Sequence, residues 1–212
     1  MMEKLLSAEG PVVGFLNKTG ELIVLSVLWI LGCLPLATIG ASNAALYFAV
    51  AKSIRCGQGS AVKEFLSSYR SNLCRGSGIT VVSGLLVGLL LWNLGFLQEQ
   101  PSAFLAGGTV ILLILLLLAW VYMGPVLSRF SISALEVWKL TFVMALRHLP
   151  VTLLLLAGTL LLAALQIFVL PMAAVLILPG LWSYLTTFLV EPALRRYMPE
   201  KDEEDNAWYF DM

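Results

Sequence analysis

The sequence predicts an all-α integral membrane protein with five transmembrane helices. Of its 212 residues, 59% are hydrophobic and only 12% are charged, whereas about 25% are charged in an ordinary soluble domain. Long runs without charge recur along the chain, and a helix needs only about 20 such residues to cross a bilayer. We therefore expect a single membrane domain at residues 1–197, followed by an acidic cytoplasmic tail at residues 198–212.

The first predicted crossing covers residues 22–51, which contain no charged side chain. Pro35 lies in its middle, where it removes a helical N–H and clashes with the preceding turn, and Gly40 follows it. We expect a structural break at these two residues. Thr38 and Asn43 lie close to the break, and their side chains can hydrogen-bond the freed carbonyls or a facing helix.

This first region resembles a known family. The runs LWILGCLPLATIGASNAALYFAVAKSIR and KEFLSSYRSNL are similar to the YesL-like family of bacterial membrane proteins, whose members carry a domain of unknown function. The positions that carry the resemblance are Leu34-Pro35, Thr38-Ile39-Gly40, Ala45, Tyr47, Phe65, Arg70 and Asn72. Ser26 departs from the family, which often has asparagine there. The resemblance extends by helix count and spacing to about Tyr197, and it implies a multi-pass protein of the bacterial cell membrane.

Four further crossings follow from the remaining apolar runs. Residues 149–190 carry no charge over about twice the length that one crossing can use, so two helices must share them. Prolines between Gln166 and Gly180 place the turn between these two helices. The predicted crossings lie at about residues 22–51, 76–97, 102–127, 149–169 and 174–194.

Two segments are amphipathic and are predicted to be cytoplasmic helices in the membrane plane. In residues 61–75, apolar side chains recur at helical spacing and charged ones take the other side. Residues 133–148 open with the capping box Ser133-x-x-Glu136, which marks a helix start.

A weak internal repeat links these two segments. Phe65 and Arg70 near the end of the first recur as Phe142 and Arg147 near the end of the second. Each pair precedes a crossing of the same direction, which predicts a parallel repeat about an axis along the membrane normal.

The basic residues predict the orientation of the chain. Lysine and arginine are concentrated in residues 52–75, 129–147 and 195–201, and are missing from the loops after the second and fourth crossings. By the positive-inside rule the basic segments are cytoplasmic, and five crossings then place the N-terminus outside.

Composition and motifs argue against several functions. The formal net charge of zero leaves no basic surface for nucleic acid. Three cysteines and one histidine have no zinc-ligand spacing, so we expect no metal. The chain has no G-x-S-x-G, H-E-x-x-H, phosphate loop or paired intramembrane carboxylates, so we expect neither an enzyme nor a cofactor.

The candidate contacts for a ligand or partner are Asn43, Phe65, Arg70, Phe142 and Arg147. Asn43 can brace the Pro35 break through a hydrogen bond, or it can contact a ligand. The two arginines can bind an anionic ligand between the halves or extend to lipid phosphates.

Two titratable residues lie at the ends of predicted membrane segments. Glu191 can couple protons or form an interface ion pair with a neighbour such as Arg195. His148 can titrate near neutral pH, or it can simply end a helix.

Three functions remain open from the sequence. The resemblance implies an accessory or assembly protein that contacts the membrane subunits of a sugar transporter, because genes of the family tend to lie among those for carbohydrate uptake and breakdown. The alternative is a small solute transporter or channel, which needs a continuous polar pathway. A lipid-binding or sensor protein that uses the basic cytoplasmic helices is the third.

Overall fold

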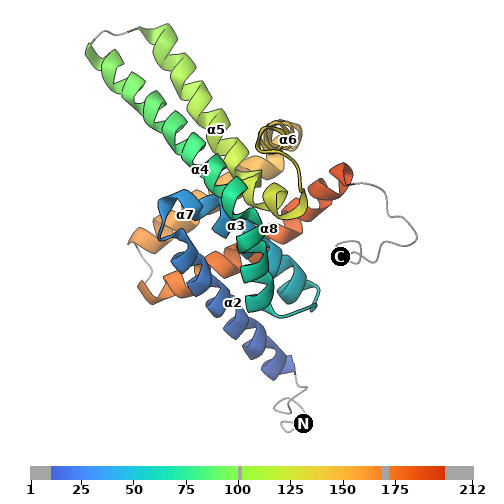
Figure 1. Ribbon diagram of the computed structural model, residues 1–212. Helices are drawn as coiled ribbons and strands as arrows, with labels where there is room; N and C mark the ends of the chain where they lie inside the picture. Colours follow the sequence, from blue (N-terminus) through green and yellow to red (C-terminus); the bar gives the residue numbers. More distant parts are fainter. Residues whose placement is uncertain (1–10, 100–101, 169–171, 199–212) are drawn as a thin grey trace.

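The computed structural model describes residues 11–99, 102–168 and 172–198, and every regular element among them is helical (Figure 1). The predicted all-α fold is confirmed. The elements are α2 (Pro11–Cys33), η1 (Leu36–Thr38), α3 (Ile39–Ala49), the π-helix η2 (Val50–Arg55), α4 (Ala61–Glu99), α5 (Ala103–Arg129), α6 (Ala134–Arg147), α7 (Leu149–Phe168), η3 (Met172–Leu176), α8 (Leu178–Leu194) and η4 (Arg195–Tyr197).

Four helical stretches are long and apolar enough to cross a membrane: Leu16–Cys33, Ala61–Leu97, Ala103–Arg129 and Leu149–Phe168. Large apolar side chains such as Leu89, Phe104 and Leu154 are exposed along them. In water such a surface would drive association, whereas the acyl chains of a bilayer cover it. These are the features of a membrane protein.

Residues 22–51 do not form one crossing, which corrects the prediction. Helix α2 ends at Cys33, the backbone of Pro35 is extended (φ −77°, ψ 109°), and the chain folds back into α3. Trp29 Nε1 donates a hydrogen bond of 2.7 Å to Asn43 Oδ1, 14 residues further along the chain. Since 14 residues of straight helix would separate these groups by about 21 Å, the two helices must lie side by side.

Thr38 closes the turn between α2 and α3. Its hydroxyl oxygen lies 2.6 Å from the carbonyl oxygen of Gly32 and 2.7 Å from that of Pro35. The hydroxyl can therefore donate to carbonyls at and just beyond the end of α2. Helix ends leave such carbonyls open, and lipid offers them no donor. The polar residues that the sequence places beside the break therefore stabilise it from within.

Gly40, which was expected to be part of the break, lies inside α3 and serves close packing. Its N–H donates to Thr80 Oγ1 of α4 at 2.9 Å. A Cβ atom at Gly40 would lie 2.7 Å from the carbonyl oxygen of Gly76, closer than real Cβ contacts come. The backbones of α3 and α4 thus touch at a pair of glycines.

Helix α3 is the buried centre of the molecule. It packs against α2, α4, α5 and α8, and most of its side chains are small, as in the run Ala41-Ser42 and the pair Ala44-Ala45. Small side chains allow helices to approach closely, which is how membrane helices gain van der Waals contact. We call α3, with the parts of these four helices packed on it, the central bundle.

Helix α4 is continuous from Ala61 to Glu99, so residues 61–75 are not a separate helix in the membrane plane. Its 39 residues span about 58 Å, against a hydrocarbon core of about 30 Å. Glycine inside a helix costs only about 1 kcal/mol, and Gly76 packs directly on the backbone of Ala41. Phe65, 2% exposed, packs in a cluster with α2 and α3 instead of facing lipid headgroups.

The later elements follow the sequence more closely. Helix α6 begins with the capping box between Ser133 and Glu136, as its residues predict. The charge-free run 149–190 is divided between α7 and α8, and Pro179 lies in the first turn of α8. Pro171, the other proline in the region of the predicted turn, lies outside the described residues.

One part of the molecule stands apart from the rest. The far ends of α4 and α5 leave the central bundle as a pair, with no other described helix beside them in Figure 1. We call residues 84–97 and 103–114 the projecting hairpin. Trp92 and Phe104 on it are 80% and 89% exposed.

Candidate ligand cavity and buried ion pair

A buried ion pair joins the ends of α5 and α8. Arg129 Nη2 donates to Glu191 Oε1, and the two side chains are only 2% and 1% exposed. The hydroxyl of Tyr47, from α3, donates to the same carboxylate oxygen at 3.0 Å. The guanidinium carbon of Arg129 lies 5.9 Å from the centre of the Tyr47 ring. Three helices are thus tied at one carboxylate.

A second arginine links α8 to the π-helix η2. Arg55 Nη1 donates to the carbonyl oxygen of Thr187 at 2.7 Å, and its guanidinium lies 4.6 Å from the centre of the Phe188 ring. Separating charges such as these from their partners in a low-dielectric interior is costly. These contacts hold α8 against the bundle. Of the two roles considered for Glu191, proton coupling and an ion pair, the geometry is that of an ion pair.

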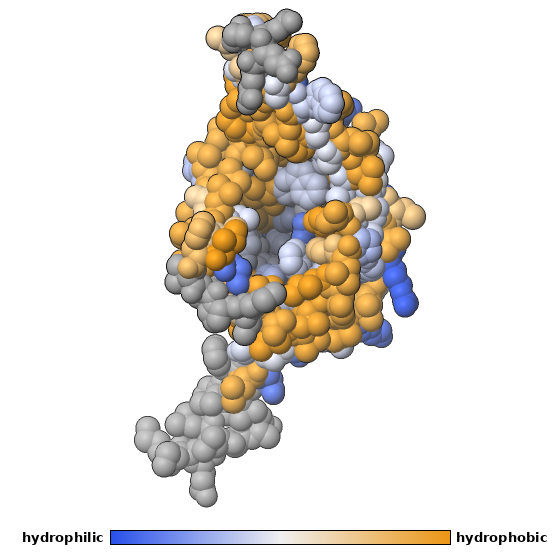
Figure 2. All heavy atoms as spheres, turned by 90° about the vertical axis from the view of Figure 1, so that its left-hand side faces the viewer, coloured by the Kyte–Doolittle hydropathy of each residue, from blue (hydrophilic) through white to orange (hydrophobic). Residues whose placement is uncertain are grey.

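Next to this network lies a cavity of about 610 Å³ between α2, α3, α5, α7 and α8. The face seen in Figure 2 is hollowed, with hydrophilic residues in its depth and hydrophobic residues around it. The lining combines three tryptophans, a tyrosine, aliphatic side chains and uncharged polar side chains. Its aromatic and polar members are Trp29, Asn43, Tyr47, Trp120, Thr159, Gln166, Trp182, Ser183 and Thr186.

Asn43 occupies a defined position in this cavity. Its Oδ1 accepts the hydrogen bond from Trp29, which fixes the orientation of the amide. Its Nδ2 has no hydrogen-bond partner among the described residues. The amide that the sequence singled out therefore both joins α2 to α3 and presents a donor on the cavity lining.

Among the described residues, no lysine, arginine, histidine, aspartate or glutamate lines the cavity. The nearest charged network touches it only through Tyr47, and there Arg129 and Glu191 offset each other. A charged ligand would lose its hydration here and meet no counter-ion, at a cost of several kcal/mol. The cavity is suited to uncharged molecules.

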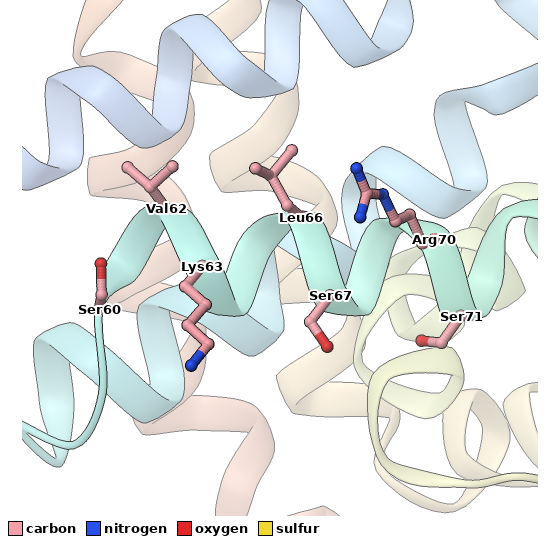
Figure 3. A pocket seen from close by; sticks show the side chains of 7 residues that line it. All are labelled: Ser60, Val62, Lys63, Leu66, Ser67, Arg70 and Ser71. Carbon is pink, nitrogen blue, oxygen red and sulfur yellow. The ribbon is translucent and has the colours of Figure 1, made fainter.

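The other predicted contact residues are not part of this cavity. Arg70 lies in line with Val62 and Leu66 along one side of the start of α4, and Lys63 projects from the other side with Ser67 and Ser71 (Figure 3). All seven residues that line this depression come from the start of α4 and Ser60, so it is a helix face and not an enclosed site. Phe65 points elsewhere and is buried.

Phe142 and Arg147 lie on α6 and contact other residues than the first pair does. Phe142 stacks on Trp138, with ring centres 5.6 Å apart, whereas the guanidinium of Arg147 lies 5.8 Å from the ring centre of Tyr197. The two halves also differ in build, because α4 runs on without a break while α6 and α7 are separate helices. The four residues do not converge on one site.

His148 lies between α6 and α7, and its ring meets that of Tyr197 edge-on at 6.4 Å between centres. Partial burial lowers the pKa of His148, and the positive charges of Arg196 and Arg147 lower it further. No acidic side chain of the described residues hydrogen-bonds to His148. This is the geometry of a residue at a helix junction.

Sequence reasoning missed the partner of Glu191 and the three cavity tryptophans. Arg129 was a detectable partner, since it ends one apolar run and Glu191 ends another on the same predicted side. Trp29, Trp120 and Trp182 lie far apart in the sequence, and tryptophan near the end of a crossing ordinarily indicates a headgroup contact. Only the fold brings them together.

Comparison with known families adds one finding. Residues 22–94 match the family described as "Protein of unknown function, DUF624". The matched part contains the α2–α3 turn, the whole of α3 and most of α4, and so covers the close glycine contact and Asn43. The family is uncharacterised. No curated protein and no solved structure matches the chain.

Proposed function

We propose that this protein is a non-enzymatic accessory or assembly partner of a carbohydrate transport system in the bacterial cell membrane, and that it contacts membrane subunits through the projecting hairpin. The resemblance to YesL-like proteins supports the link to carbohydrate uptake. The structural observation that supports partner binding is a set of glycines on the hairpin that pack against no other described part of the chain.

These glycines form one stripe on α4. Gly84, Gly88 and Gly95 are 4 and 7 residues apart, which places them on one side of a helix with 3.6 residues per turn. A Cβ atom added at any of them would meet nothing within 4 Å. Small residues at such spacing let a second membrane helix approach closely. The stripe is thus available to a helix of another protein.

The orientation forms part of this proposal. Basic residues support a cytoplasmic position for η2, the start of α4, α6 and the end of α8. Because the chain folds back at Pro35, the start of α2 lies on the same side as η2, with which α2 packs. We therefore place the N-terminus in the cytoplasm, in place of the outside position expected from five crossings.

The experiment is affinity purification of the tagged full-length protein from native membranes. We expect membrane subunits of a carbohydrate transporter to co-purify. Gly88→Leu should abolish this, since leucine fills the stripe while favouring the helix. The matched control is Leu86→Phe, which adds bulk on the opposite side of α4. Capture of only a second copy of the chain, or equal capture by both variants, would contradict the proposal.

The alternative, a small solute transporter or channel, is favoured by the cavity between α2, α3, α5, α7 and α8. It makes an opposite prediction for the purified protein. Liposomes containing the protein alone should show no sugar uptake under the accessory role, whereas a transporter would equilibrate or accumulate the sugar.

A further inference from the structure

The cavity of about 610 Å³ has a composition that selects a class of ligand. We infer that it binds one uncharged, hydroxyl-bearing amphiphile taken up from the bilayer, such as a molecule of the monoacylglycerol type. This inference concerns a small molecule and stands independently of the accessory role proposed for the hairpin.

The ligand is inferred to be uncharged because the described residues of the lining include no ionisable group except the Tyr47 hydroxyl. That hydroxyl is already donated to Glu191, whose carboxylate also carries the bond from Arg129. The lining therefore offers a charged ligand no counter-ion. Ammonium or carboxylate headgroups would be excluded by the cost of desolvation.

The ligand is inferred to carry a hydroxyl because of the hydrogen-bonding groups of the lining that are still available to it. Asn43 Nδ2 can donate, because only the Oδ1 of this amide is hydrogen-bonded to other described residues. Thr159 and Thr186 donate their protons to the carbonyl oxygens of Leu155 and Ser183, at 2.8 and 2.7 Å, so their oxygens are left to accept. A hydroxyl group both accepts and donates, and so it suits both kinds of group.

The apolar part of the ligand follows from the rest of the wall. Trp29, Trp120 and Trp182 present large ring surfaces, and aliphatic residues of α5 and α7 fill the space between them. Aromatic rings bury large apolar area and hold few alternative conformations. An acyl chain would be covered by these rings while its polar end reaches Asn43.

The cavity tryptophans provide a direct readout of binding. In a background in which Trp92, Trp138 and Trp208 are phenylalanine, the only remaining tryptophans are those of the cavity. The probe is a medium-chain monoacylglycerol with a bromine atom at the end of its chain, since bromine quenches tryptophan on contact. Two further probes have the same brominated chain, one as the free carboxylate and one as the methyl ester without hydroxyls. All are added to the full-length protein in phosphatidylcholine nanodiscs.

We expect saturable quenching by the monoacylglycerol and much weaker quenching by the carboxylate and the methyl ester. Asn43→Leu should raise the dissociation constant about tenfold, the effect of one hydrogen bond in a desolvated site. Asn93→Leu is the matched control, because it removes the same amide from the projecting hairpin, and it should leave binding unchanged.

A second variant keeps the test decisive where Asn43→Leu weakens the fold. Ala163→Phe fills the cavity from α7 without removing a hydrogen bond, and it should abolish saturable quenching. Ala164→Phe, on the neighbouring exposed position outside the lining, should not. Equal quenching by the three probes, or unchanged binding in Ala163→Phe, would overturn the inference.

Discussion

Glycine has different roles in the central bundle and in the projecting hairpin. In the bundle, Gly40, Gly76 and Gly180 each lie where an added Cβ would come within 2.8 Å of another helix. In the hairpin, Gly84 and Gly88 meet nothing. A G-x-x-x-G spacing in an apolar run therefore does not tell whether the helix partner lies in the same chain or in another molecule.

The central bundle and the projecting hairpin also differ in their charged groups. The bundle holds Arg129 and Glu191 in a buried pair, whereas the described side chains of the projecting hairpin include no titratable group. The bundle gains its specificity from polar contacts that are costly to break, and the hairpin from apolar surface that lipid or another helix can cover. Substitutions made in parallel in both regions test this difference.

The largest effect is expected at the buried ion pair. Glu191→Leu leaves the Arg129 guanidinium without its carboxylate, and loss of one partner of a buried pair costs about 3–5 kcal/mol. Thermal unfolding of the purified protein in detergent should show a large fall in Tm. The double variant Arg129→Met with Glu191→Leu should recover much of it. A single variant as stable as the wild type would mean that the pair does not hold α5 and α8 together.

The second effect compares glycines in the two regions. Gly40→Ala forces a Cβ to within 2.6 Å of Thr80 Oγ1 and 2.7 Å of the Gly76 carbonyl, so α3 and α4 must move apart. Overpacking of this kind costs about 1–3 kcal/mol. Gly88→Ala meets no atom and should gain up to about 1 kcal/mol from helix propensity. If both variants shifted Tm in the same direction, the distinction between used and unused glycines would fail.

The sequence predicts the helical elements better than the way they fold back. Charge-free runs identify apolar helices because lipid requires every backbone group to be bonded within the segment. The same runs could not reveal the reversal at Pro35, since a bent crossing and a tight hairpin share one composition. The bond from Trp29 to Asn43 distinguishes them, and it depends on two side chains meeting in space.

The amphipathic pattern of residues 61–75 wrongly predicted a separate helix in the membrane plane, for a related reason. Phe65 and Tyr69 of its apolar face pack on α2 and α3, whereas Val62 and Leu66 stay exposed. Periodicity shows that one helix face is buried and does not identify what buries it. The cavity was beyond prediction because its wall is assembled from six elements spread along the chain. Of its lining residues, only Asn43 was a candidate contact from the sequence.

The third effect compares two interhelical hydrogen bonds to asparagine. Bonds of this kind in membranes contribute about 0.6 to 2 kcal/mol. Asn43→Leu removes the acceptor at 2.7 Å and leaves Trp29 N–H unsatisfied, so its loss should lie at the upper end. Thr109 Oγ1 lies 2.9 Å from both Asn93 Oδ1 and the Leu105 carbonyl, so Asn93→Leu leaves it another acceptor and should lie at the lower end. Equal losses in detergent unfolding would argue against this distinction.

The smallest effect concerns pH, and we expect it from His148 at the junction of α6 and α7. The pKa of His148 is lowered in the folded protein by partial burial and by Arg196 and Arg147, so the unfolded chain binds its proton more readily. Stability from the neutral ring is therefore complete above the unfolded value of about 6.5 and falls as pH drops below it. Hydrogen bonds to Ser133 lower the pKa of Glu136 from 4.5, so its contribution is lost only in more acidic solution.

The two pH ranges allow the histidine to be tested by itself. Tm measured from pH 8 to pH 5 should decline slightly in the wild type, and His148→Gln should flatten the profile over that range. Gly88→Ala is the control from the projecting hairpin, and it should shift the whole profile without changing its slope. A decline that persists in His148→Gln would assign the titration to another group outside the projecting hairpin, because the described side chains of the hairpin have none that ionises.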